Sequence, residues 1–314
     1  MQSKSVNYTE TGEIELIEIE VQDPGSGEIQ LRGAVCGICS WDIATCKLGM
    51  EMSVPAPPGH EGIGYVTKVG AGVTGFKEGD RVAGGGFHTL RNQSTTGLHR
   101  LPESSSLDDV FWLVEPLSCV VTGIDVCRLR AGDRVAVIGC GFMGQMLLQV
   151  LTRSYALEVI GLDINADRLE MARSFGVNEV YNLSDSNTDD LIQELHSRNI
   201  DIVIDTSGSQ SGLDLATKLV RRGGMINLFG WIKGTQATFD PSTWHLGGFT
   251  IVNSSPNARM RNPFPVAIDL IEHDVVDLKP LVTHIVDLEA YPDLMKQIIA
   301  GDGSYVKGVI RLND

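Results

Sequence analysis

RVAVIGCGFMGQMLLQVLTRSYALEVIGLDI, from Arg134 to Ile164, is the stretch that decides the fold. The apolar run 135–138 predicts a buried strand, 146–151 a helix, and 159–162 a second strand. Three glycines with the spacing G-x-G-x-x-G lie between the first strand and the helix, and Asp163 ends the second strand. This order of strand, glycine turn, helix, strand and acid is typical of the start of a doubly wound parallel sheet.

Each part of this stretch has a physical role in binding a dinucleotide. The first glycine permits a tight turn, the second lets the backbone approach a pyrophosphate, and the third lets the helix pack against the strand. The N-terminus of the helix offers free N–H groups to phosphates, and a carboxylate at the end of the second strand can bind the ribose hydroxyls. The alternative is a glycine turn in an unrelated α/β domain. We expect cofactor contacts from Gly139, Gly141, Phe142, Met143, Gly144, Asp163, Ile164 and Arg168.

The acid at position 163 also predicts the choice of cofactor. A carboxylate beside the ribose would repel a 2′-phosphate, so NAD is expected over NADP. Arg168 is the one nearby cation, and we expect it to pair with Asp163 and to reach a ribose hydroxyl or the solvent rather than a phosphate.

The composition is that of a soluble globular chain, with 42% hydrophobic and 21% charged residues among 314. A net charge of −15 argues against nucleic acid and anionic membranes as partners. The first residues carry no apolar segment typical of a signal peptide, and no apolar run approaches the ~18–20 residues of a membrane span. The six cysteines therefore predict reduced thiols or metal ligands, and we expect a cytoplasmic protein.

Strand and helix patterns divide the chain into two domains. Short β runs, such as 14–20 and 29–35, fill the first hundred residues. From about Cys119 strands and helices alternate, which predicts a parallel sheet covered on both faces. Its expected strands are 135–138, 159–162, 178–180, 201–204 and 225–229. A strand at 250–252 opens a mixed tail with helices near 263–273 and 291–299. We expect a Rossmann domain at 119–251 and a β-rich catalytic domain formed by 1–118 and 252–314.

Candidate metal ligands lie in the β-rich part. Cys39 stands in GICSWD, His60 and Glu61 in PGHEG, and Glu115 in VEPLS. One thiolate, one imidazole and two carboxylates suit Zn²⁺, which takes sulfur, nitrogen and oxygen ligands and keeps a position open in catalytic sites. From the residues alone, Cys39 is as well explained as a buried structural thiol, and His60 as a histidine held in a turn.

The ordered set GICSWD, PGHEG, GDRV, EPLS, VIGCGFMG and LDIN resembles the medium-chain, zinc-dependent alcohol and polyol dehydrogenase family from end to end. The EP pair is similar to the sorbitol and threonine dehydrogenase branch. The resemblance implies a GroES-like catalytic domain beside the Rossmann domain. It implies a catalytic zinc bound by Cys39, His60 and Glu115, with Glu61 in or next to this ligand set. Cys36, which forms a CxxC with Cys39, is expected to be structural.

The resemblance also implies cofactor contacts outside the glycine turn. Thr206 follows the strand 201–204, and Phe229 ends the strand 225–229, where backbone in the family faces the cofactor. Lys307 matches a basic position that can reach the pyrophosphate; the alternative for this residue is a solvated lysine.

Two features depart from the family. Many relatives bind a structural zinc with four closely spaced cysteines after the GDRV strand, but no cysteine lies between Val82 and Glu115, so we expect a single zinc, the catalytic one. Relatives have Ser or Thr two places after the cysteine ligand, which accepts the substrate's hydroxyl proton. Trp41 stands there, and an indole is only a donor. Ser40, Glu61 or water must then take that role, unless the register of this loop is shifted.

The function implied by the resemblance is reversible hydride transfer between NAD and a small-molecule alcohol, polyol or sugar-like substrate, catalysed by a homodimer or homotetramer. Two alternatives stay open: a non-catalytic nucleotide-binding protein, and a zinc-free NAD(P)H reductase of the same superfamily. The joint presence of Cys39, His60 and Glu115 speaks against both.

Overall fold

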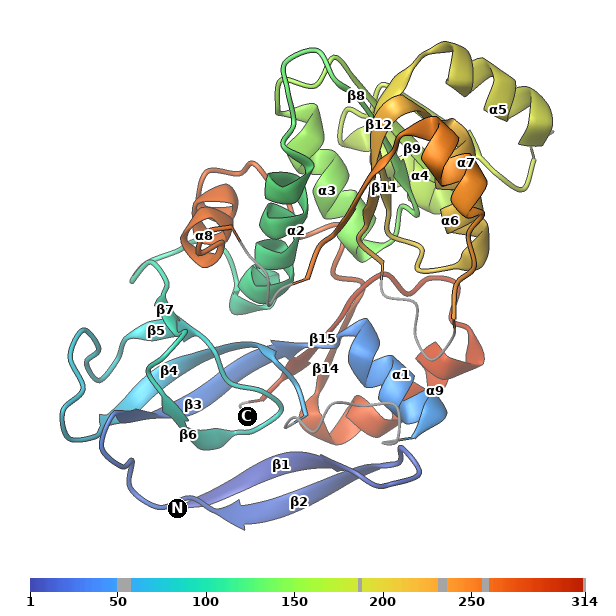
Figure 1. The fold of residues 1–314 in the computed structure, drawn as a ribbon. Coiled ribbons are helices and arrows are strands. Elements are labelled where there is room, and N and C mark those ends of the chain that lie inside the picture. Colours follow the sequence, from blue (N-terminus) through green and yellow to red (C-terminus); the bar gives the residue numbers. More distant parts are fainter. Residues whose placement is uncertain (50–57, 186–187, 231–235, 256–259, 313–314) are drawn as a thin grey trace. The chain divides into compact units, whose positions relative to one another are not determined.

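The computed structural model describes residues 1–49, 58–185, 188–230, 236–255 and 260–312 (Figure 1). It divides into two compact units, one formed by Met1–Pro116 with Leu278–Asp314 and the other by Leu117–Asp277. The expected α/β fold, a Rossmann sheet with a β-rich GroES-like domain, is confirmed.

The second unit is built around a six-stranded sheet in the order β10-β9-β8-β11-β12-β13, and every pair in it is parallel. The strand order reverses at β8, which is the doubly wound arrangement. Helices lie on both sides of the sheet, with α3 on one side and α6 on the other (Figure 1). Its elements are α2 (Val114–Cys127), β8 (Arg134–Ile138), α3 (Phe142–Thr152), β9 (Glu158–Asp163), α4 (Ala166–Ser174), β10 (Glu179–Asn182), α5 (Thr188–Ser197), β11 (Ile200–Asp205), α6 (Gln210–Leu219), β12 (Val220–Leu228), α7 (Pro241–Gly247), β13 (Thr250–Asn253) and α8 (Phe264–Glu272).

The central strands of this sheet are apolar in their middle parts because helices cover both faces. Residues 135–138 of β8 are all buried, and β9 and β11 pack against them on either side. The strands predicted from the sequence at these positions all form, within one to five residues at their ends.

The return to the first unit occurs later than the predicted boundary at residue 252. β13 pairs in parallel with β12, from Met225↔Thr250 to Leu228↔Asn253, and so completes the sheet of the second unit. α8 follows within the same unit, and the chain leaves it only after Asp277. The boundary was misplaced because an edge strand that ends a sheet and a strand that opens a new domain have the same local pattern.

The first unit contains a seven-stranded sheet in the order β14-β15-β3-β4-β5-β7, with β6 pairing with β3, and a separate antiparallel pair, β1-β2. β14 and β15 come from the C-terminal segment. β15 therefore pairs with β3, a strand that lies near the other end of the sequence. Its elements are β1 (Gln2–Tyr8), β2 (Ile14–Glu20), β3 (Glu28–Gly37), α1 (Ser40–Leu48), β4 (Glu61–Val69), β5 (Arg81–Ala83), β6 (Leu90–Ser94), β7 (His99–Arg100), η2 (Asp109–Phe111), β14 (His284–Asp287), η3 (Leu288–Ala290), α9 (Tyr291–Ala300) and β15 (Gly308–Arg311).

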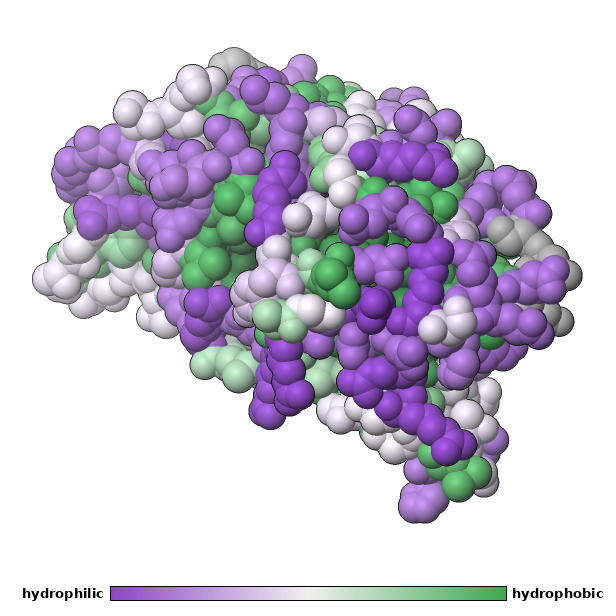
Figure 2. All heavy atoms as spheres, turned by 90° about the horizontal axis from the view of Figure 1, so that it is seen from above, coloured by the Kyte–Doolittle hydropathy of each residue, from purple (hydrophilic) through white to green (hydrophobic). Residues whose placement is uncertain are grey.

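One helical stretch, Asp109–Cys127, is long and apolar enough to cross a membrane, with a mean hydropathy of 1.6 over its most apolar window. The expectation that no stretch reaches this length was therefore wrong. Two thirds of the window (67%) is buried inside the protein, however, as in a core helix. The face in Figure 2 is mostly hydrophilic, with apolar side chains in separate patches.

Candidate functional site

Cys39 lies where β3 ends and α1 begins, and the local sequence fixes it there. It is the N-cap residue of α1, and its backbone N–H donates to Oδ2 of Asp42 at 2.7 Å, as in a capping box. Asp42 is fully buried, and its other oxygen accepts a hydrogen bond from the Tyr8 hydroxyl at 2.9 Å. Burial raises the pKa of Asp42, while His60 and these two donors oppose that shift.

His60 and Glu61 come from the turn that leads into β4, which pairs antiparallel with β3, so that Gly37 lies opposite Glu61. The absence of a side chain at Gly37 is what admits the carboxylate, because a Cβ there would lie 2.2 Å from Oε2 of Glu61. The strand pairing therefore brings the end of GIC and the end of PGHE to one place.

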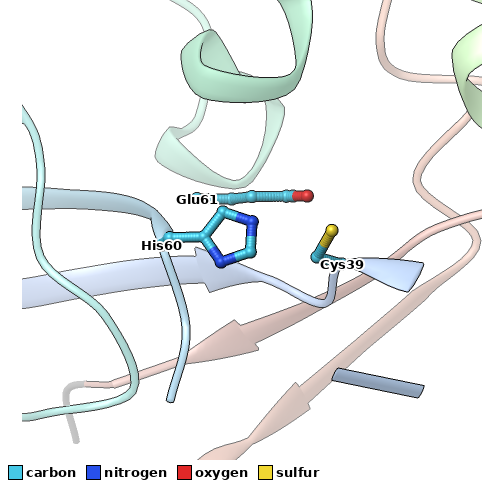
Figure 3. Close-up of side chains that lie close together, drawn as sticks. All are labelled: Cys39, His60 and Glu61. Carbon is cyan, nitrogen blue, oxygen red and sulfur yellow. The ribbon is translucent and has the colours of Figure 1, made fainter. Parts of the chain in front are cut away.

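Cys39, His60 and Glu61 form a group whose ligand atoms all lie within 4.8 Å of one another (Figure 3). Zinc holds such ligands at roughly 2.0–2.3 Å, which in a tetrahedron separates them by about 3.3–3.8 Å. Small side-chain rotations would close that difference. The thiol, imidazole and carboxylate are also the ligand types that zinc prefers, so the residues fit the metal.

His60 is surrounded by groups that carry negative charge when ionised, as expected at a site that binds a cation. Burial alone lowers the pKa of His60, but the hydrogen bond and charge of Cys39 and the charges of Glu115 and Glu61 outweigh it and raise the pKa to about 10. Glu115, the second residue of α2, thus acts on the group electrostatically but does not belong to the three-residue cluster. The resemblance left open which of the two glutamates lies closer to Cys39 and His60, and the structure groups Glu61 with them.

Lys307 lies in the interior of the first unit. Its Nζ is 2.5 Å from Oε2 of Glu61 and donates to the carbonyl oxygen of Ile38 at 2.7 Å. The assignment of Lys307 to a pyrophosphate is not supported by this geometry, because the ammonium is buried and already bonded. Sequence reasoning missed this ion pair; the available signal was a lysine among apolar neighbours, Val306 and Val309.

The residues flanking Cys39 face different surroundings. Cys36 is fully buried in a hydrophobic cluster with Tyr8 and Tyr291, as expected of a structural thiol, and the half-buried Trp41 packs against the same cluster. Ser40 is exposed at the first position of α1. Ser40 therefore presents an accessible hydroxyl beside the metal cluster, whereas much of the Trp41 side chain packs against the hydrophobic core.

The glycine turn in the second unit has the geometry that a dinucleotide needs. Gly139 has a φ of +90°, and a Cβ at Gly144 would lie 2.0 Å from the carbonyl oxygen of Gly139, so only glycine permits this approach of helix and strand. Gly141 caps α3, and the nearest atom to a Cβ built there is 4.0 Å away. The backbone at Gly141 is therefore open to a ligand at the helix N-terminus.

Asp163 lies beside this turn, as predicted, but its partners differ from those expected. It is 5% exposed, and its two oxygens accept the backbone N–H groups of Cys140 at 2.6 Å and Asn165 at 2.9 Å. Arg168 does not pair with it. Nη1 of Arg168 is instead the atom nearest to a Cβ built on Gly141.

Most of the other expected cofactor residues lie around the same turn, and one lies farther away. The Thr206 hydroxyl donates to the carbonyl oxygen of Gly139 at 2.6 Å and so stabilises the turn. Phe142 and Met143 form the first turn of α3, and Ile164 is 70% exposed beside Asp163. Phe229 lies farther along the sheet, with its ring against Gly123 of α2.

Comparison with known proteins matches one family to part of each unit. The family described as alcohol dehydrogenase GroES-like domain matches residues 25–102, and the family described as zinc-binding dehydrogenase matches residues 143–273. The chain belongs to the zinc-dependent medium-chain alcohol and polyol dehydrogenase family.

Relatives within this family include polyol and amino-acid dehydrogenases. Human sorbitol dehydrogenase is 26% identical over 88% of this chain and 87% of its own length. L-threonine 3-dehydrogenase of Aliivibrio fischeri is 27% identical over 91% and 93%. Among solved structures, 2R,3R-butanediol dehydrogenase of Bacillus subtilis superposes with a TM-score of 0.87 at 22% identity, covering 99% of this chain and 100% of its own, which shows the shared fold.

Proposed function

We propose that this protein is a zinc-dependent oxidoreductase that transfers a hydride between NAD and a secondary alcohol, polyol or sugar-like substrate. The observation that carries the proposal is the clustering of Cys39, His60 and Glu61 within 4.8 Å in a unit attached to a doubly wound sheet with an open glycine turn. A non-catalytic nucleotide-binding protein would need the open glycine turn but not the cluster of metal ligands.

The metal ligands in this proposal are Cys39, His60 and Glu61, with Glu115 adding negative charge. Zinc supplies Lewis acidity that lowers the pKa of a substrate hydroxyl, and the nicotinamide supplies the hydride acceptor. Lys307 neutralises Glu61 and holds its carboxylate beside Gly37. Ser40, exposed next to Cys39, is the side chain placed to exchange the substrate's proton with solvent, in the role that Trp41 cannot fill.

The dinucleotide is held by the second unit. The N-terminus of α3 binds phosphate through its backbone N–H groups, and the carboxylate of Asp163, fixed by two backbone amides, faces the ribose. A homodimer or homotetramer without nucleic-acid or membrane partners, located in the cytoplasm, stays a prediction.

Metal analysis and a substrate screen test the proposal together. Purified protein should contain about one zinc per chain and reduce NAD with at least one member of a panel of polyols, sugars and secondary alcohols. Metal-free protein that still reduces carbonyls with NAD(P)H would support the zinc-free reductase instead. Protein that binds NADH but turns over no substrate, with or without zinc, would support the binding protein.

A further inference from the structure

Tyr8 and Tyr291 place two phenol hydroxyls in the interior of the first unit, where the hydride transfer described above gives them no role. Tyr8 ends β1 and Tyr291 begins α9, so the two residues come from opposite ends of the chain. Their hydroxyl oxygens are 2.7 Å apart, and the residues are 7% and 0% exposed. Buried polar groups in proteins are hydrogen-bonded, so the further partners of this pair indicate what it does.

The hydrogen bonds of the pair have a defined direction. The Tyr8 hydroxyl donates to Oδ1 of Asp42 at 2.9 Å, and a hydroxyl has only one proton to donate. Tyr291 must therefore donate to Tyr8. Burial and, after it, the charge of Asp42 raise the pKa of both phenols, so both keep their protons at neutral pH. The result is a chain of donors that runs from Tyr291 through Tyr8 to the carboxylate, and such chains strengthen each other's bonds in a protein interior.

This chain of hydrogen bonds ends at the loop that carries the cysteine of the metal cluster. The other oxygen of Asp42 accepts the backbone N–H of Cys39 at 2.7 Å. Because both oxygens are held, the carboxylate cannot rotate without losing one of its bonds. The Tyr8 hydroxyl thus fixes the acceptor that fixes the backbone from which the Cys39 thiol extends.

The ring of Tyr291 supports the second ligand-bearing segment. Its centroid lies 4.8 Å from that of Phe87. The Phe87 ring in turn packs against the turn that leads into β4, where a Cβ built on Gly59 would lie 2.8 Å from it. Gly59 has a φ of +76°, and His60 follows it directly. One residue of the C-terminal segment therefore acts on both ligand-bearing segments, on one through its hydroxyl and on the other through its ring.

We propose that Tyr8 and Tyr291 are positioning residues of the metal site, which hold two of its three ligands in place before zinc binds. The inference rests on the proposed function, since it takes Cys39, His60 and Glu61 as the ligands. Segments that are fixed beforehand lose less conformational freedom when the metal binds, and they keep its ligands close to the required geometry. A hydrogen-bonded core that stabilises only the fold would leave the metal affinity unchanged.

Competition with a zinc chelator on the purified full-length protein tests this role without turnover. Tyr8→Phe keeps the ring and removes the hydroxyl, and it should weaken zinc binding by roughly ten- to a hundredfold, as is typical for residues that orient metal ligands. Tyr291→Phe should weaken it by about threefold to tenfold, the range for one hydrogen bond between uncharged groups. Tyr65→Phe is the matched control: it removes a phenol hydroxyl that donates to Asp109 at 2.9 Å in the same unit, and it should bind zinc as the wild type does.

Cobalt in place of zinc supplies a spectroscopic readout, because the d–d bands of Co²⁺ depend on coordination geometry. Tyr291→Leu removes the ring as well as the hydroxyl. It should shift these bands and weaken zinc more than Tyr291→Phe does, because the turn before His60 then loses its support. Tyr65→Phe should reproduce the wild-type spectrum.

A double-mutant cycle tests whether the two tyrosines act in sequence. Tyr291→Phe should have little further effect on zinc affinity in a Tyr8→Phe background, because its hydroxyl acts through Tyr8. Full additivity of the two losses would overturn the chain of hydrogen bonds. If Tyr8→Phe does not fold, Tyr291→Phe alone decides, since it leaves Asp42 with its donor.

The outcomes separate this inference from the proposed function. Wild-type protein with one zinc per chain, together with unchanged zinc affinity in Tyr8→Phe and Tyr291→Leu, would overturn the inference and leave the proposed function standing. An equal loss of affinity in Tyr65→Phe would show a general effect of stability and would also overturn it. Wild-type protein that binds no zinc would overturn both.

Discussion

Lys307 and Glu61 form a buried ion pair, with 2.5 Å between Nζ and Oε2 and side chains that are 4% and 3% exposed. Burial lowers the pKa of Lys307, but the charge of Glu61 outweighs it, so the ammonium keeps its proton. The pair joins β4 to the C-terminal segment that returns to this unit, and it places one charged partner directly behind the metal cluster.

Lys307→Met should therefore destabilise the metal-free protein by about 3–5 kcal/mol, because it leaves a buried carboxylate unpaired. The double variant Glu61→Gln/Lys307→Met should recover part of that loss. Urea unfolding in the presence of a chelator measures both. Lys77→Met is the control, since Lys77 forms an exposed pair with Glu103 and should matter by less than about 1 kcal/mol. Equal losses at Lys307 and Lys77 would contradict the buried pair.

Local sequence signals predicted the second unit well and the interior of the first unit poorly. The glycine turn and Asp163 belong to one short stretch whose geometry is set by neighbours along the chain. Lys307 and Glu61 meet because β15 pairs with β3 and β3 pairs with β4. Neither pairing can be predicted from the residues near Lys307. Gln145 on α3 is fully buried, and its Nε2 donates to the carbonyl oxygens of Cys140 and Arg168. The sequence did not indicate this, because in an amphipathic pattern a buried glutamine looks like a polar surface residue.

The metal cluster gives a second prediction. Cys39→Ser should remove most bound zinc and nearly all turnover, because a hydroxyl replaces the softest of the three ligands. Cys46→Ser is the control: this cysteine lies on the same helix, α1, but outside the ligand group. Elemental analysis and initial rates give the two readouts. Full zinc content in Cys39→Ser would mean that another residue holds the metal.

Trp41 gives a third prediction, in which two effects compete. Relatives have a hydroxyl residue that takes the substrate's proton at this position, whereas the structure packs part of Trp41 against the core cluster that contains Tyr8 and Tyr291. Trp41→Ser should therefore lower the free energy of unfolding by about 2–3 kcal/mol, less than for a fully buried tryptophan. Any change in substrate preference should appear on top of that loss. Unchanged stability with altered preference would show that the indole faces only the substrate.

His88 predicts a pH dependence of stability in the first unit. Burial and the charge of Arg91 lower the pKa of His88 to about 4, below its value of about 6.5 in an unfolded chain. Between these values the unfolded chain binds more protons, so the free energy of unfolding falls as the pH falls, by up to about 3 kcal/mol.

The comparison with His88→Asn isolates this contribution from that of the carboxylates. Asparagine keeps an acceptor for the Ser5 hydroxyl, which lies 2.6 Å from Nδ1 of His88. The variant should lose less stability than the wild type between pH 6.5 and pH 4.5 in chemical denaturation. Parallel pH profiles for the two proteins would show that His88 titrates normally in the folded state.

Asp163 carries the prediction of cofactor choice, and its geometry decides which variant is informative. Because both its oxygens hold backbone N–H groups, Asp163→Ser would disturb the glycine turn as well as remove the charge. Asp163→Asn removes the charge and keeps the shape and one acceptor oxygen, but its amide nitrogen then faces the other backbone N–H, so the turn is disturbed at one hydrogen bond instead of two. In the wild type a carboxylate about 4 Å from a 2′-phosphate costs on the order of 1–4 kcal/mol, so kcat/KM should favour NAD over NADP roughly tenfold to several hundredfold. Asp163→Asn should narrow that ratio by about tenfold or more, mainly by raising kcat/KM with NADP.

Arg168 does not cancel this effect, because its guanidinium lies at the glycine turn and not against Asp163. Equal kcat/KM values for the two cofactors in the wild type, or a ratio that the asparagine leaves unchanged, would show that another residue discriminates between them.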